Sequence, residues 1–272
     1  FMKKIGFIGA GHIASAIASG ILASGHCSAD DICVYDVDGQ KCAAYADAGF
    51  TVCKDEADVA ANARYVFVCV RQKDLKSVLG KLAGNVTGAN VIISVIAGVS
   101  ISYFKKALGR ECKVVRLMPN TPMLKGVGAT AMSYEMPITY GELTEIRELL
   151  ETTGIVEMLP EDRMNEVISV NSSSPVYFYM LLRAMINGAV AQGIDEETAK
   201  RLVFATAEGS VKLAETSDQS LDEMIAQVCT PNGTTVKAME FLEKHGFEQA
   251  VSDAMLACTK RAYALEKETD AE

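Results

Sequence analysis

The chain has 272 residues, of which 49% are hydrophobic, and a formal net charge of −9. This length and composition predict a folded protein with a substantial core, in one large domain or two moderate ones, and exclude a disordered chain. The acidic balance argues against nucleic acid and anionic membranes as partners, because both bind basic surfaces, and it favours a small-molecule ligand.

An apolar, strand-like run opens the chain and leads into a helix through glycines. The run from Lys3 stops at Gly9, and from Ile13 the apolar residues recur at spacings of three and four, as on one face of a helix. The turn reads G-x-G-x-x-A from Gly9 to Ala14, which allows a tight bend, a close approach of backbone to a pyrophosphate and helix packing on the strand. Its candidate cofactor-binding residues are Ile8, Gly9, Ala10, Gly11, His12 and Ile13.

An acidic residue, Asp36, ends the next strand-like run, Ile32 to Tyr35. It lies roughly 20–25 residues after the glycines, where a carboxylate can accept a hydrogen bond from a ribose hydroxyl. An ordinary strand-helix turn would not explain this residue. With Asp38 nearby, Asp36 would repel a 2′-phosphate, and the first basic residue after them is Lys41. We therefore expect NADH or NADPH as cofactor, with NADH slightly favoured.

Strand-like and helical segments then alternate along the chain. The expected strands and helices are, in order, 51–53, 56–63, 65–70, 73–82, 90–95, 101–108 and 113–118. Such alternation predicts an α/β fold with a doubly wound sheet. We expect a Rossmann-type dinucleotide-binding domain over residues 1–160.

Polar or glycine residues follow three of these strands, where core packing alone would not require them. They are the segments 69–72, 94–98 and 116–122. In open α/β sheets, ligands collect at the carboxyl ends of the strands. The three segments should therefore line one crevice together with the Gly9 turn.

The pattern changes beyond Pro160, where hardly any strand pattern remains. Long helical stretches are expected at 176–192, 196–215, 221–228, 234–245 and 247–267. An all-helical substrate and dimerisation domain over residues 161–272 is therefore predicted. Small residues along its helices indicate helix-on-helix contacts and a subunit interface, with a self-contained bundle as the alternative.

A polar turn rich in threonine, Cys229 to Thr235, precedes one of these helices. The free N–H groups at the helix start, with the hydroxyls of Thr230, Thr234 and Thr235, would suit a carboxylate ligand. Ordinary capping of the helix by a hydroxyl would explain the same residues. The residues alone leave both interpretations open.

Several other chemistries are not predicted. The three histidines, His12, His26 and His245, form no Ser-His-Asp set and no metal cluster. A nicotinamide enzyme without an evident acid-base histidine or lysine must reduce a substrate that is already electrophilic, such as a protonated imine. The eight cysteines contain no C-x-x-C pair and several lie in strand-like runs, which indicates reduced, buried thiols. No membrane span or secretory segment is expected, and we expect a cytoplasmic protein.

Taken together, these motifs resemble the delta-1-pyrroline-5-carboxylate reductase family. The likeness covers essentially the whole chain and rests on five motifs in order. Three of them are the Gly9–Ala14 turn, Ala97-Gly98-Val99, and Met118 to Pro122, which reads M-P-N-T-P as in the family. The other two are Val70-Arg71-Gln72, where the family has V-K-P, and Thr230 to Thr235, where the family has S-P-G-G-T/A-T. The resemblance implies a reductase that uses NAD(P)H to make L-proline, built as a homodimer through the helical domain or as a ring of such dimers.

The resemblance also implies roles for particular residues. The substrate carboxylate would be held by backbone N–H groups of Gly233, Thr234 and Thr235, beside Thr230. The hydroxyl of Thr235 would bond the ring nitrogen as the catalytic group. Asn120 and Ala97, with Gly98, would border the nicotinamide, whereas Val70, Arg71 and Gln72 would contact the ribose and phosphates.

The chain departs from the family pattern at one helix start, and the departure keeps other functions open. The family has S-G-S-G-P-A where this chain reads Asn171 to Val176, with serines in place of glycines, which should reshape any site beside that helix. A reductase of a related cyclic imino acid and a non-catalytic dinucleotide-binding protein are therefore alternatives. A β-hydroxyacid dehydrogenase is disfavoured, because that class needs an early lysine in its second domain and none occurs between Lys125 and Lys200.

Overall fold

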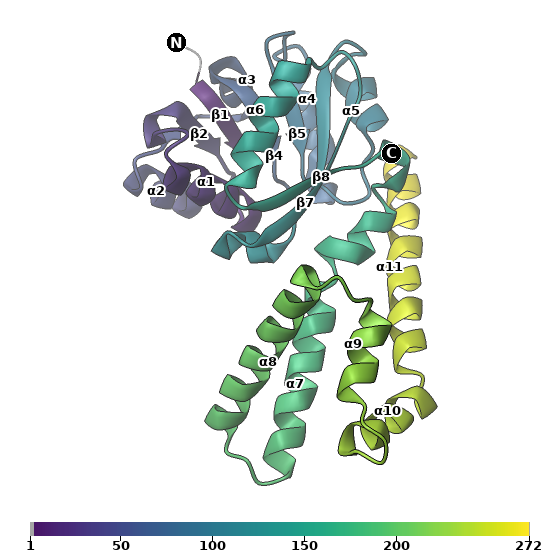
Figure 1. Ribbon diagram of the computed structural model, residues 1–272. Coiled ribbons are helices and arrows are strands. Elements are labelled where there is room, and N and C mark those ends of the chain that lie inside the picture. Colours follow the sequence, from purple (N-terminus) through teal and green to yellow (C-terminus); the bar gives the residue numbers. More distant parts are fainter. Residues whose placement is uncertain (1–2, 272) are drawn as a thin grey trace. The chain divides into compact units, whose positions relative to one another are not determined.

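The computed structural model describes residues 3–271 (Figure 1). Within this range eight strands form one sheet: β1 Lys3–Ile8, β2 Ile32–Tyr35, β3 Thr51–Val52, β4 Ala63–Val68, β5 Val91–Ser94, β6 Lys113–Met118, β7 Gly128–Tyr134 and β8 Gly154–Met158. Their order is β3-β2-β1-β4-β5-β6-β7-β8. Strands β1 to β6 are parallel, in the order of a doubly wound nucleotide-binding sheet, β7 runs antiparallel to β6, and β8 is parallel to β7.

Helices cover both faces of this sheet. They are α1 His12–Ser24, α2 Gly39–Asp47, α3 Glu56–Asn62, α4 Gln72–Leu82, α5 Ile101–Leu108 and α6 Tyr140–Glu151, with the short helices η1 Ala29–Asp31, η2 Thr121–Lys125, η3 Glu161–Arg163 and η4 Ile168–Ser172. One core unites Ile17 of α1 and Ile146 of α6 with the sheet, and the other contains Val59, Leu79 and Phe104 from α3, α4 and α5. The apolar residues that set the helical periodicity thus face the strands.

The predicted α/β fold is confirmed, a Rossmann-type sheet followed by helices. The strands at 32–35 and 113–118 and the helices at 101–108 and 221–228 have the predicted bounds. The sequence analysis missed β7, α6 and β8, which extend the sheet. The reason is composition: β7 reads GATAMSY, so that small and hydroxyl-bearing residues interrupt the apolar run that marks the other buried strands.

The chain divides into two compact units. Val176–Leu256 form one, and the described residues up to Pro175 form the other together with those from Ala257 onward. The helical unit contains most of α7 Pro175–Ala191, α8 Glu196–Thr216, α9 Leu221–Val228, α10 Thr234–Lys244 and the start of α11 Phe247–Asp270. Helix α11 therefore begins in one unit and ends in the other.

These units differ in their bounds from the two domains expected at 1–160 and 161–272. Residues 161–175 and the last turns of α11 belong with the sheet. The physical reason is an apolar cluster in which Met118 and Ala131 of the sheet pack against Met164, Ile168 and Ala262. The predicted boundary follows the change in secondary-structure pattern, whereas the compact units follow packing.

Two further properties concern the described residues as a set. None of their helices has the length and apolar character needed to cross a membrane. None of the eight cysteines, all of which lie in the described part of the chain, forms a disulfide, and four of them, Cys27, Cys33, Cys53 and Cys112, are buried. Burial raises the pKa of Cys112 to about 11, so this thiol stays protonated at neutral pH.

Candidate functional site

The glycine turn after β1 lies at the point where the strand order reverses, between β1 and β4. The Gly9 N–H donates to the Tyr35 carbonyl (2.8 Å) and the Cys69 N–H donates to the Ile8 carbonyl (2.8 Å), which joins the ends of three adjacent strands. Gly9 has φ +96°, and a Cβ there would lie 2.6 Å from the Cys69 carbonyl oxygen. Only glycine fits this position, at the place where open α/β sheets bind their ligands.

The start of α1 has the features of an anion site. Gly11 is the N-cap, no side chain caps the helix, and its first turn contains no acidic residue. A Cβ built on Gly11 would meet no atom within 4 Å, and Gly11 lines an open cleft. Uncapped N–H groups and the positive end of the helix dipole fit the pyrophosphate of a dinucleotide.

Asp36 connects β2 to the glycine turn. One carboxylate oxygen accepts from the Ala10 N–H (2.7 Å) and lies 3.4 Å from the Lys41 ammonium, and the other accepts from the Asp38 N–H (2.8 Å). Burial alone would raise the pKa of Asp36, but the two N–H donors and the Lys41 charge outweigh it and hold the pKa below its ordinary value. Asp36 is therefore an anion at neutral pH and has lone pairs left for a further donor.

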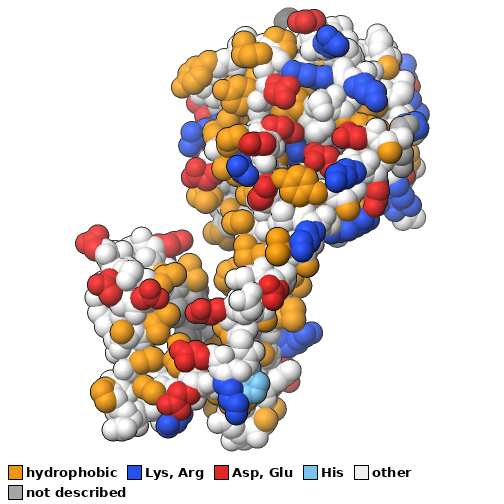
Figure 2. All heavy atoms as spheres, turned by 90° about the vertical axis from the view of Figure 1, so that its right-hand side faces the viewer, with side chains coloured by type: hydrophobic (Ala, Val, Ile, Leu, Met, Phe, Trp, Pro, Cys, Tyr) orange, Lys and Arg blue, Asp and Glu red, His pale blue; other side chains and the backbone are white. Residues whose placement is uncertain are grey.

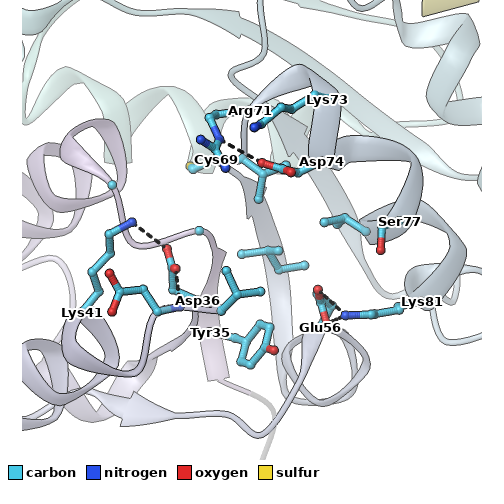
Figure 3. Close-up of a pocket in the computed structure, with 17 residues that line it drawn as sticks. Tyr35, Asp36, Lys41, Glu56, Cys69, Arg71, Lys73, Asp74, Ser77 and Lys81 are labelled. Carbon is cyan, nitrogen blue, oxygen red and sulfur yellow. Dashed lines mark hydrogen bonds and ion pairs between the residues drawn. The ribbon is translucent and has the colours of Figure 1, made fainter.

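A cleft of about 600 Å³ extends from this turn between β2, α3 and α4 (Figure 3). Three ion pairs lie along it: Lys41–Asp36, Arg71–Asp74 at 2.9 Å, and Lys81–Glu56 at 3.0 Å. The cleft residues that the sequence analysis did not assign to the site include Tyr35, Val37, Glu56, Lys73, Ser77, Val78 and Lys81. Four cations and four carboxylates thus line the cleft, a balance that leaves it without a strong net charge.

Lys73 differs from the other cations of the cleft. Among the described residues, it has no carboxylate partner. Lys73, Ser77 and Lys81 follow each other at a spacing of four along α4, on one face of the helix, while Leu75 and Leu79 are buried on the opposite face. This polar stripe beside an apolar one is a signal in the sequence that could have identified the α4 wall of the cleft.

Most residues predicted from the glycine turn and the second strand lie at this cleft. Ile8, Gly9, Gly11, Asp36, Val70 and Arg71 line it. Ala10 is buried and contributes its N–H to Asp36. His12 is exposed on the first turn of α1, and Ile13 packs against the core.

Gln72, predicted to contact the ribose and phosphates, and the residues predicted for the nicotinamide end do not line this cleft. The Gln72 side chain points to α11, where its amide donates to the Leu265 carbonyl (3.1 Å). Ala97 is exposed in the turn after β5, and Gly98 is buried against α11. The Asn120 amide is engaged inside the sheet unit, where it donates to the Asn171 carbonyl (3.2 Å) and accepts from the Ala129 N–H (2.9 Å).

The threonine turn lies in the helical unit and ends at the start of α10. Asn232 has φ +59°, a left-handed conformation that asparagine tolerates better than most residues. Gly233 is the N-cap of α10, and no side chain caps this helix. A Cβ on Gly233 would lie 2.5 Å from the Thr230 hydroxyl oxygen. The threonines therefore do not cap the helix, and the N–H groups at its start have no side-chain acceptor.

Other kinds of site have no support in the described residues. No group of three or more His, Cys, Asp or Glu among residues 3–271 could hold a metal ion. Cys69 lines the cofactor cleft, but burial raises its pKa to about 12, so it is not a thiolate nucleophile. The chemistry available here is binding by backbone N–H groups, hydroxyls and ion pairs.

Two family models match parts of this chain. Residues 161–265 match the model described as pyrroline-5-carboxylate reductase dimerisation. Residues 4–98 match the model described as NADP oxidoreductase, coenzyme F420-dependent. The first match begins in η3 and ends in α11, and the second contains the glycine turn and the cleft.

Full-length relatives are similar along nearly the whole chain. A pyrroline-5-carboxylate reductase of Escherichia coli is 32% identical over 266 residues, which cover 97% of this chain and 99% of the relative. A pyrroline-5-carboxylate reductase 3 of Danio rerio is also 32% identical, covering 97% of this chain and 92% of the relative.

Solved structures have the same fold. A pyrroline-5-carboxylate reductase from Coxiella burnetii has a TM-score of 0.86 at 27% identity and covers 97% of this chain and 99% of that one. The pyrroline carboxylate reductase of Plasmodium falciparum, solved with NADP bound, has a TM-score of 0.90 at 24% identity and covers 98% of this chain and 100% of that one.

Proposed function

The chain belongs to the pyrroline-5-carboxylate reductase family, and on this premise we propose that it reduces the cyclic imine delta-1-pyrroline-5-carboxylate to L-proline with NAD(P)H. It would be an oxidoreductase acting on a C=N bond. The observation that carries this proposal is a pair of helix starts without side-chain caps, one at Gly11 and one at Gly233. The first suits the phosphates of a dinucleotide and the second suits a carboxylate.

The glycine turn would hold the dinucleotide. Its uncapped N–H groups would bind the pyrophosphate, Asp36 would accept from the adenosine ribose, and the unpaired Lys73 and the Val70–Arg71 segment would border the phosphates. When bound, the cofactor supplies the hydride that reduces the imine carbon. Ala97, Gly98 and Asn120 would border its nicotinamide. Because the Asn120 amide already bonds Asn171 and Ala129, Asn120 would contribute by fixing the conformation of its turn.

The threonine turn would hold the substrate. The N–H groups of Gly233, Thr234 and Thr235 would bind the carboxylate, with Thr230 beside them, because the start of α10 offers donors that no side chain uses. The Thr235 hydroxyl would orient and polarise the ring nitrogen. This role positions the substrate and needs no strong acid, since the imine is already electrophilic.

We propose NADH as the preferred cofactor, with NADPH as the alternative. Asp36 is ionised, and the nearest cation, Lys41, is already paired with it. A 2′-phosphate would therefore lie beside the Asp36 carboxylate without a free cation among the described neighbours to pair with, whereas a ribose hydroxyl could donate to Asp36. The NADP-bound relative from Plasmodium falciparum is the reason for testing both cofactors.

We further propose that residues 1–160 are the dinucleotide-binding domain and that residues 161–272 are the substrate and dimerisation domain, which assembles a homodimer or a ring of dimers. No residue of α7, α9 or α10 is buried. Large apolar side chains such as Phe178, Phe204 and Leu213 are more than half exposed, and Figure 2 shows hydrophobic side chains open on the helices of this unit. Exposed apolar faces of this extent are typical of subunit interfaces.

A spectrophotometric assay tests the activity. NADH and NADPH oxidation at 340 nm is followed with the five-membered imino acid and with its six-membered analogue. We expect turnover with the five-membered ring and a higher kcat/KM with NADH. A higher kcat/KM with the six-membered ring would instead indicate a reductase of a related imino acid. Cofactor binding without turnover would indicate a non-catalytic protein.

A further inference from the structure

The last turns of α11 contact the segments that follow β4 and β5 and a charge cluster that includes Arg116 of β6. The residues that make these contacts, Ala262, Leu265, Glu266 and Thr269, follow at spacings of three, four and seven from the first, which places them on one face of the helix. All of them belong to the same compact unit as the sheet. One helix face therefore contacts the segments that follow β4 and β5 and strand β6 itself.

The first contact involves Gln72, which follows the Val70–Arg71 segment of the cleft. Its side-chain amide donates to the Leu265 carbonyl (3.1 Å) and to the Thr269 hydroxyl, which in turn donates to the same carbonyl (2.9 Å). Thr269 is only 5% exposed. The three groups form a closed set of hydrogen bonds at the end of α11, away from the cofactor cleft.

The second contact is steric and involves the turn after β5. Gly98 has φ +68°, and a Cβ there would lie 2.8 Å from the Leu265 Cβ and 3.4 Å from the Ala262 carbonyl oxygen. The helix backbone therefore lies directly on the Ala97–Gly98 turn. The absence of a side chain at Gly98 is what permits this approach.

The third contact is a buried charge cluster that contains Arg116 of β6. Arg116 is 1% exposed and donates to Glu161 (3.0 Å) and Asn165 (2.7 Å), and Asn165 donates to Glu266 (2.7 Å). Glu161 also accepts from the Ile101 N–H (3.0 Å), at the start of α5. Moving Glu266 away would leave the buried Arg116 with less charge compensation, which is costly. The cluster therefore holds the end of α11 against the sheet.

We propose that Gln72 and Thr269 are positioning residues of the cofactor site. The contacts at Gly98 and Arg116 fix the end of α11 in place. The hydrogen bonds of Gln72 and Thr269 then keep the segment after β4 in one conformation, which is the conformation in which Val70 and Arg71 bind the dinucleotide. This rests on the proposed function of the cleft. Neither residue lines the cleft, so losing either one should weaken cofactor binding and leave the chemical step unchanged.

A matched pair of substitutions at Thr269 tests the proposal. Thr269→Val keeps the shape and removes the hydroxyl, whereas Thr269→Ser keeps the hydroxyl. For the valine variant we expect a rise of about 3–10-fold in Kd and KM for the reduced cofactor, the worth of one hydrogen bond, with kcat and the KM for the imine unchanged. The serine variant should stay near the wild-type values. Cofactor Kd is measured by fluorescence titration, well below the Tm of every variant.

A double-mutant cycle with Gln72→Met gives a second measurement. Because the two side chains belong to one set of bonds, the combined variant should lose little more affinity than either single one. Equal cofactor Kd in Thr269→Val, Thr269→Ser and wild type would overturn the positioning role, as would full additivity in the cycle. A wild-type protein that binds neither NADH nor NADPH would overturn the proposed function and this inference together, whereas equal Kd values in proteins that do bind the cofactor overturn this inference alone.

Discussion

Asp36 serves both the local fold and the proposed ribose site. Its carboxylate accepts two backbone N–H groups, from Ala10 and Asp38, and these bonds keep it ionised. The same group faces the cleft in which an adenosine ribose would lie. A single residue therefore links the shape of the glycine turn to the choice of cofactor.

Replacing Asp36 by serine should shift cofactor preference. Asp36→Ser removes the negative charge and keeps a group that can bond a phosphate, while Lys41 loses its partner and becomes available to a 2′-phosphate. We expect the ratio of kcat/KM for NADPH to that for NADH to rise by roughly tenfold, the effect of about 1.4 kcal/mol. Steady-state kinetics with both cofactors measure it, and Asp55→Ser, which changes the cap of α3 and does not line the cleft, is the control. An unchanged ratio would mean that Asp36 does not touch the ribose.

Thr235 is the residue on which the proposed chemistry depends. Thr235→Ala should lower kcat/KM for the imine by roughly 10–100-fold, the worth of about one hydrogen bond to a polar substrate, with cofactor Kd little changed. Thr235→Ser retains the hydroxyl and should keep most of the activity. Full activity in the alanine variant would remove Thr235 from the mechanism.

At the scale of elements, the packing of α11 on the turn after β5 can be tested by substituting two glycines that have similar backbone conformations. Gly98 and Gly126 have φ +68° and +72°, but only Gly98 has atoms near the position of a Cβ. Gly126→Ala should therefore lower the free energy of unfolding by about 1–2 kcal/mol, the cost of the left-handed conformation alone.

Gly98→Ala adds overlap with Leu265 to the same conformational cost. We expect it to lower the free energy of unfolding by about 1–3 kcal/mol more than Gly126→Ala. Urea denaturation of the two variants and the wild type gives both values. A similar loss of unfolding free energy in the two variants would show that α11 moves to accommodate the added methyl group, so that the contact at Gly98 is not tight.

Elements also differ in how well their sequence predicts them. Helix α5 and strand β6 have strong periodicity or apolar runs, and the predicted bounds match the structure. Strand β7 contains small and polar residues that become buried only because other strands and helices cover them, for example Thr130 and Ser133. Its place in the sheet depends on tertiary contacts that no local pattern records.

At the scale of the whole molecule, the exposed apolar helices predict an oligomer. Phe178→Glu or Leu213→Glu places a charge on a surface that we expect a second subunit to cover, so either variant should dissociate the oligomer. Size-exclusion chromatography with light scattering measures the mass. Ile155→Glu on β8 is the control, because Ile155 is also exposed but lies on the sheet, on the same face as Glu157. A wild-type protein that elutes as a monomer would contradict the expectation.

The sequence by itself determined most strands and helices up to β6, the long helices beyond Pro160, the glycine turn with Asp36 and the threonine turn before α10. These features depend on neighbours within a few residues, through periodicity, backbone freedom and helix ends, and the motifs that carry the family are of this local kind. Only the tertiary structure decided that Lys73 and Lys81 line the cleft, that the Asn120 amide is used inside the fold, and that Gln72 points to α11. A hydrogen bond that spans 193 residues, from Gln72 to Leu265, has no trace in local sequence, because it exists only once packing brings the two segments together.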